Sequence, residues 1–175
     1  MTSAAHEWLW ESLHDLFDTD DGSSPEIHVG YPRRGGVPAG FGYLTSLADP
    51  LSGDATYWSV VDQRDEPIEN PGHVAELVVG GQSDPFHVSL RGVRFEHGPE
   101  LPDLGCFVFP DQLALDYRPG PSWGACELSS LFSVLKALVE LSEGASLSAG
   151  AMGVADADRF TLAWNRFLGL GRGRD

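Results

Sequence analysis

Short runs of apolar, aromatic and β-branched residues follow one another through the middle of the chain, and each run is bounded by Gly, Pro, Asp or Asn. The runs span residues 26–31, 41–45, 56–61, 74–79, 85–95, 104–109 and 112–118. Runs of this length and composition, separated by turn-forming residues, are typical of β-strands joined by hairpins. The spacing therefore predicts a mainly antiparallel sheet of about six or seven strands.

Two of these runs carry further information. The apolar positions of residues 86–95 are even up to Leu90 and odd from Val93, which predicts a β-bulge at the intervening glycine. Residues 104–109 are apolar throughout, which predicts a central strand covered on both faces. In such a strand Cys106 is expected to be a buried, unreactive thiol.

Helical periodicity replaces the strand pattern at both ends of the chain. Apolar residues recur at three- and four-residue steps over residues 6–17, 128–144 and 156–169, with residues 145–149 as a short edge strand between the last two. The order helix, strands, helices predicts an α+β fold in a single globular domain, residues 1–175. The N-terminal helix and the two C-terminal helices are expected to pack on one face of the sheet.

The chain of 175 residues is strongly acidic, with a formal net charge of −15. Residues 1–87 hold 15 of its 26 acidic side chains and only 3 of its 11 basic ones. Such a field repels the phosphates of nucleic acids and anionic membrane surfaces, so neither is an expected partner. The sequence shows no secretory signal and no apolar run long enough for a membrane span, and its 2 cysteines suit a reducing cytoplasm.

No motif that defines a common enzyme class occurs in the sequence. It lacks a nucleophile elbow, a P-loop, a Rossmann glycine fingerprint and the usual zinc motifs. The glycine-rich segment 30–42 contains Arg33 and Arg34, but we expect it to precede a strand. Pro32 and Pro38 also remove backbone donors that a phosphate would need. The segment is therefore interpreted as a hairpin loop.

The sequence predicts neither a metal nor another cofactor. Its 6 histidines include no pair at the helical i, i+4 spacing, although His28 and His87 would meet if their strands were neighbours. Residues 18–25 begin like a calcium loop, but Val29 stands where the bidentate glutamate is needed. These residues are therefore interpreted as a solvated loop.

The segment 113–128 runs from a predicted strand, through a proline-containing turn, into a predicted helix. Trp123 is expected to fill the core where that helix begins. Cys126 falls in the first helical turn, where the helix dipole favours a thiolate, so Cys126 and Asp116 are the candidate catalytic residues. A cysteine hydrolase also needs a histidine close in space, and the nearest in sequence is the distant His97.

The acidity of the N-terminal half is the strongest indication of function. We expect an acidic protein-binding module, such as an inhibitor or immunity protein that neutralises a basic effector, because complementary charge speeds association and selects partners. The predicted partner-binding residues are Glu7, Glu11, Asp15, Asp18, Asp20 and Asp21.

Two other functions stay open. One is a hydrolase-like enzyme with a site around Cys126. The other is a structural or assembly subunit, which the 5 Trp and 9 Phe favour if they exceed what one core needs. An acidic patch bordered by aromatic side chains would support partner binding, whereas a pocket around Cys126 would support catalysis.

Overall fold

The computed structural model describes residues 6–171, and in that range it forms a five-stranded sheet, a separate two-stranded hairpin and five helices. The main sheet is antiparallel throughout, in the order β4-β5-β6-β1-β7. Its strands are β1 (Glu26–Gly30), β4 (Phe86–Leu90), β5 (Leu104–Val108), β6 (Gln112–Tyr117) and β7 (Ser146–Gly150). The hairpin consists of β2 (Thr56–Ser59) and β3 (Arg64–Pro67). The predicted α+β class with a mainly antiparallel sheet is confirmed.

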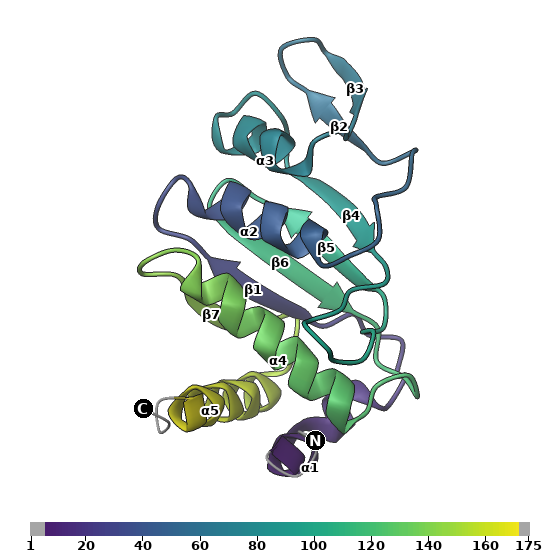
Figure 1. The fold of residues 1–175 in the computed structure, drawn as a ribbon, viewed down its shortest axis with the longest axis vertical. Helices are drawn as coiled ribbons and strands as arrows, with labels where there is room; N and C mark the ends of the chain where they lie inside the picture. Colours follow the sequence, from purple (N-terminus) through teal and green to yellow (C-terminus); the bar gives the residue numbers. More distant parts are fainter. Residues whose placement is uncertain (1–5, 172–175) are drawn as a thin grey trace.

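The helices lie on one side of the sheet. They are α1 (Glu7–Phe17), α2 (Gly36–Ser46), α3 (Pro71–Val79), α4 (Ala125–Glu140) and α5 (Val154–Gly171). Figure 1 shows α2 and α4 across the sheet and α3 beside α2, while α1 and α5 pack against each other and against α4. Among residues 6–171, no helix is both long and apolar enough to cross a membrane.

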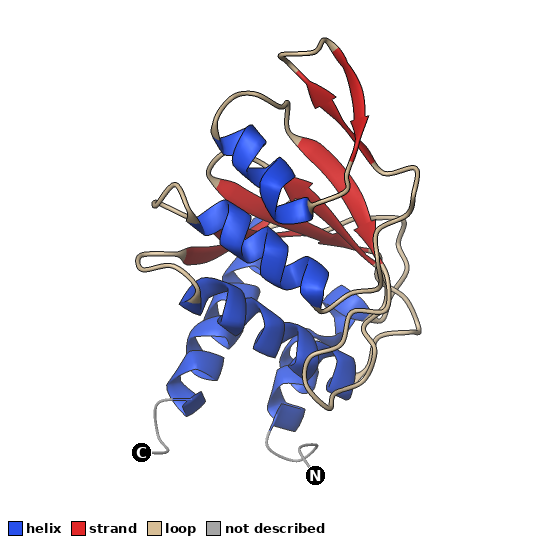
Figure 2. Ribbon diagram, turned by 45° about the horizontal axis from the view of Figure 1, so that its top comes forward, coloured by secondary structure: helices blue, strands red, loops and turns tan. Residues whose placement is uncertain are grey.

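The opposite face of the sheet carries the alternate, more polar residues, and Figure 2 shows α2, α3 and α4 only on the other side. On this open face Phe107 is only partly buried, whereas Gly105 is buried beneath the side chain of Asp116. β5 is thus almost fully buried, as expected for a central strand. Its cover on the open face comes from side chains of neighbouring strands rather than from a second layer of helices.

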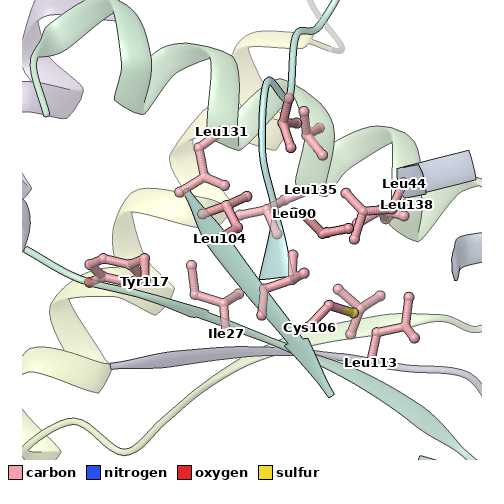
Figure 3. Packing of buried hydrophobic residues seen from close by; sticks show 14 of the residues in the cluster. Ile27, Leu44, Leu90, Leu104, Cys106, Leu113, Tyr117, Leu131, Leu135 and Leu138 are labelled. Atoms are coloured by element: carbon pink, nitrogen blue, oxygen red, sulfur yellow. The ribbon is translucent and has the colours of Figure 1, made fainter. Parts of the chain in front are cut away.

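Successive side chains of each strand point to opposite faces of the sheet, and the apolar ones point toward the helices (Figure 3). Ile27, Cys106 and Leu113 come from three different strands, and Leu135 and Leu138 of α4 belong to the same cluster. All five are completely shielded from solvent. The prediction of a buried Cys106 is confirmed, and its burial raises the pKa of the thiol well above the usual range.

Residues 41–45, which we expected to form a strand, belong to α2. Their aromatic and β-branched composition is typical of strands. Val37, Phe41 and Leu44, however, lie at i, i+4 and i+7, and all three are buried on the inner face of the helix. Packing of this face against the sheet and α3 outweighs the local preference for a strand.

Residues 74–79 were also predicted as a strand and instead form most of α3. The Asn70 side chain caps this helix by accepting a backbone N–H at 3.2 Å, and Pro71 occupies its first position. Val74 and Val78 lie one turn apart and are both buried. The Asn-Pro pair is a helix-start signature, but the β-branched run that follows it favoured the wrong prediction.

The predicted bulge after β4 is instead the end of the strand. Gly92 has a φ of +65°, in the left-handed region that favours glycine. Beyond it the chain leaves the sheet and runs beside the segment that follows α2, where the Arg94 N–H donates to the Leu47 carbonyl at 3.0 Å. The pleat is therefore not resumed, because the glycine turns the backbone away.

Candidate functional site

The segment 113–128 is a corner of the fold, as the sequence indicated. Trp123 is 4% exposed and packs its ring edge against Phe17 and Tyr117, with centroids 5.1 and 5.5 Å apart. Its indole N–H donates to the Arg118 carbonyl at 3.0 Å. Trp123 thus fills the core where β6 leads into α4.

Asp116 lies on the open face of the sheet and does not line the pocket at Cys126. Its carboxylate reaches across β5 to His87 Nε2 on β4, at 2.7 Å. Gly105 makes this possible, because a Cβ at that position would overlap the carboxylate. The two candidate catalytic residues are therefore not brought together.

His28 makes a similar pair on the same open face. Its Nε2 lies 2.8 Å from Glu26 Oε2 on β1, and the ring occupies space that a Cβ at Gly150 would fill. β1 and β4 are separated by β5 and β6, so His28 and His87 are not on neighbouring strands. In the part of the chain that the structure describes, no group of three or more His, Cys, Asp or Glu side chains is placed to hold a metal ion.

The predicted partner-binding residues differ in how free their charges are. Glu7 and Glu11 are exposed on α1. The other four carboxylates already have partners within the protein. Three are in the ion pairs Asp15–Arg159, Asp18–His14 and Asp20–Arg118, and Asp21 accepts a hydrogen bond from the Ser23 N–H. Only part of this acidic segment is therefore available to a partner without breaking internal contacts.

Arg159 joins α5 to α1 through this acidic segment. It donates to both carboxylate oxygens of Asp15, at 2.6 and 2.9 Å, and to the Ser12 carbonyl at 2.8 Å. The hydrogen bonds from Arg159 lower the pKa of Asp15 from its ordinary value of 3.8.

We expect Asp15→Asn to lower the free energy of unfolding at pH 7 by up to about 1 kcal/mol, since the pair is half exposed and screened by solvent. A carboxylate with a depressed folded pKa stabilises the protein above its unfolded pKa and loses that contribution as the pH falls through the folded value. In urea unfolding, the difference from wild type should therefore shrink as the pH falls below the ordinary carboxyl value of 3.8. Asp158→Asn changes an exposed acid of α5 that is outside any ion pair among the described residues; it is the control, and an equal loss from it would contradict the assignment.

The β2–β3 hairpin carries a surface that the sequence did not reveal. Trp58, Val60 and Val61 are 40%, 39% and 69% exposed. The acidic residues in and around the hairpin are Asp54, Asp62, Asp65, Glu66 and Glu69. The one basic residue among them, Arg64, pairs with Glu66 at 2.5 Å. The apolar run 56–61 correctly predicted a strand, but it did not show that this strand lies outside the main sheet.

Residues 36–42 of the glycine-rich segment already belong to α2, so the interpretation of the segment as a hairpin loop that precedes a strand is wrong. Arg33 pairs with Glu143, and the Gly36 N–H is already bonded to the Arg33 carbonyl at 2.9 Å. Arg34 lines an open hollow between α2 and α3, but Glu76 lines the same hollow and disfavours an anion there. These contacts are those of a structural connection between β1 and α2.

Cys126 is exposed and lines a pocket at the start of α4. The same pocket is lined by His6, His97 and Ser129, and its volume is about 430 Å³. Ser129 Oγ lies 3.0 Å from His6 Nδ1. The structure thus supplies histidines near Cys126 that are remote in sequence, and a hydroxyl–imidazole pair that sequence spacing could not reveal.

No family model matches this chain, and the searches of curated proteins and of solved structures likewise found no match. What the protein binds is therefore inferred from its own surface chemistry.

Proposed function

We propose that this protein is an acidic binding module for a basic protein, as an inhibitor or immunity protein is for the effector that it neutralises. The observation that carries the proposal is the β2–β3 hairpin, where exposed apolar side chains stand among carboxylates. Three of the six large hydrophobic side chains that are exposed in the described chain fall within residues 58–61. An exposed apolar group surrounded by polar residues is typical of a protein-binding surface.

The two kinds of side chain in the hairpin have different parts in binding. Trp58 has the size and rigidity of the residues that dominate interface energies once they are covered. The surrounding carboxylates attract a positively charged partner and repel an acidic one, which affects the association rate and specificity more than the affinity. A basic partner therefore satisfies both the apolar and the charged part of this surface.

The acidic face of α1 does not belong to the same contact surface. Figure 1 shows the β2–β3 hairpin and α1 at opposite ends of the molecule's longest axis. Glu7 and Glu11 are therefore proposed to act on a partner through long-range attraction, which salt screens over about 10 Å. Their contribution should appear in the association rate rather than in the stability of the complex.

A photo-crosslinking amino acid at Val61 tests where a partner binds. In extract of the producing cells, we expect a crosslinked protein of basic isoelectric point from position 61. The same group at Leu162, which is 70% exposed on α5, is the matched control and should give no such product. Equal products from both positions, or an acidic protein at position 61, would contradict the proposal.

With the crosslinked partner purified, Trp58→Ala/Val61→Ala should weaken the equilibrium affinity by about 30-fold, or about 2 kcal/mol. Glu7→Gln/Glu11→Gln should slow association at low salt and leave the dissociation rate unchanged. Surface plasmon resonance at several salt concentrations measures both effects. An affinity that is indifferent to salt and to the hairpin substitutions would overturn the proposal.

A further inference from the structure

The pocket at the start of α4 brings together a hydroxyl and an imidazole from segments 123 residues apart in the sequence. The 3.0 Å contact joins Ser129 Oγ to Nδ1 of His6, and the His6 ring lies against Phe167 of α5 with centroids 5.1 Å apart. Burial lowers the pKa of His6 below its ordinary value of 6.5, so the imidazole is neutral at pH 7. A neutral imidazole can accept the Ser129 proton, which is the relation between a nucleophile and its general base.

The same pocket has room for a small molecule and lies at the start of a helix. Its volume is about 430 Å³, and Phe95 and Pro99 give it an apolar wall. Ala125 and Cys126, the first two residues of α4, also line it, and the start of this helix has no side-chain cap. The first N–H groups of a helix have no partner within the helix and favour an anion at their end. A developing oxyanion in the pocket would therefore be stabilised.

We propose that this pocket hydrolyses small uncharged carboxylic esters, with Ser129 as the nucleophile and His6 as the general base. No Lys or Arg of the described chain lines the cavity, whereas Glu96 does, so an anionic substrate is disfavoured. This activity goes beyond partner binding and does not depend on it. Figure 1 shows the start of α4 beside α1, at the end of the molecule opposite the β2–β3 hairpin.

The reaction proceeds in two balanced steps. Ser129 Oγ bonds to the ester carbonyl carbon while its proton passes to His6 Nδ1. The carbon–oxygen bond to the alcohol then breaks, and the departing oxygen takes that proton. Water next attacks the acyl-Ser129 ester, giving its proton to His6, and the carboxylic acid leaves as Ser129 recovers a proton from His6.

A fluorophosphonate probe and 4-nitrophenyl acetate test the proposal on the full-length protein. We expect the probe on the peptide that contains Ser129, located by mass spectrometry, and a catalysed release of nitrophenol. Ser129→Ala should abolish the labelling, and His6→Gln should slow turnover by about 100-fold, the usual contribution of a general base. Trp58→Ala/Val61→Ala, at the hairpin and remote from the pocket, should hydrolyse the ester at the wild-type rate.

Two further measurements separate this activity from a purely structural Ser129–His6 contact. The rate should fall on acidification with a midpoint below pH 6.5, because the base must be neutral and its pKa is lowered. Iodoacetamide should alkylate the exposed Cys126, spare the buried Cys106, and suppress turnover by filling the pocket. Probe attached to Cys126 instead of Ser129, or a turnover that Ser129→Ala leaves unchanged, would overturn the proposal.

Discussion

Replacing Trp123 with alanine is expected to lower the free energy of unfolding by about 3–5 kcal/mol, the usual cost of deleting a buried Trp or Phe side chain. The substitution empties the space beside the stacked rings of Phe17 and Tyr117, whose centroids are 4.4 Å apart. It also removes the indole hydrogen bond to the Arg118 carbonyl. This site joins α1, β6 and the start of α4, so no single element can move to close the cavity.

Urea unfolding monitored by circular dichroism measures this loss. Trp58→Ala is the matched control, because it removes the same side chain from an exposed position and should change stability by no more than about 0.5 kcal/mol. A loss from Trp123→Ala that is as small as that of the control would show that Trp123 does not fill the core.

Replacing Gly40 with alanine is expected to destabilise the protein by about 1–3 kcal/mol through overpacking. A Cβ at Gly40 would overlap the Tyr31 hydroxyl and lie 2.9 Å from its Cζ. The ring cannot easily move away, because its hydroxyl donates to the Leu138 carbonyl of α4 at 3.0 Å and the side chain is buried. The better helix propensity of alanine, worth about 1 kcal/mol, offsets only part of this cost.

Gly42 is the natural control for this prediction, since it lies in the same helix and a Cβ there meets no atom within 4 Å. Gly42→Ala should leave stability unchanged or raise it by up to about 1 kcal/mol. In the Tyr31→Phe background, Gly40→Ala should cost less than in wild type, because the overlapping oxygen is gone. Additive effects in this double-mutant cycle would contradict direct steric contact between the two side chains.

The main sheet and the terminal helices could be predicted because their apolar periodicity is local and agrees with the final packing. The runs 26–31, 104–109 and 112–118 each alternate or stay apolar as a strand in this sheet requires. α2 and α3 could not be predicted in this way. Over so few positions, their β-branched and aromatic residues fit the two-residue period of a strand as well as the 3.6-residue period of a helix. Burial against the sheet selected the helix in both cases.

For the candidate sites, even less could be predicted from the sequence than for the fold. The acidic residues of α1 were visible in the sequence, but the internal partners of Asp15 and Asp20 were not, because Arg159 and Arg118 are about a hundred residues away or more. The exposure of Trp58 was equally hidden, since a strand inside the sheet and one outside it have the same local composition.

By itself, the sequence determined the fold class, the order of the terminal helices and most strands, the acidic charge and the corner at Trp123. These follow from side-chain periodicity and composition, which act over a few residues. Only the tertiary structure decided that two central segments are helical, that a hairpin outside the main sheet exposes apolar side chains among carboxylates, and that His6 meets Ser129 beside Cys126. The physical reason is that exposure and contact between distant segments depend on how the elements pack together, and local sequence does not encode that packing.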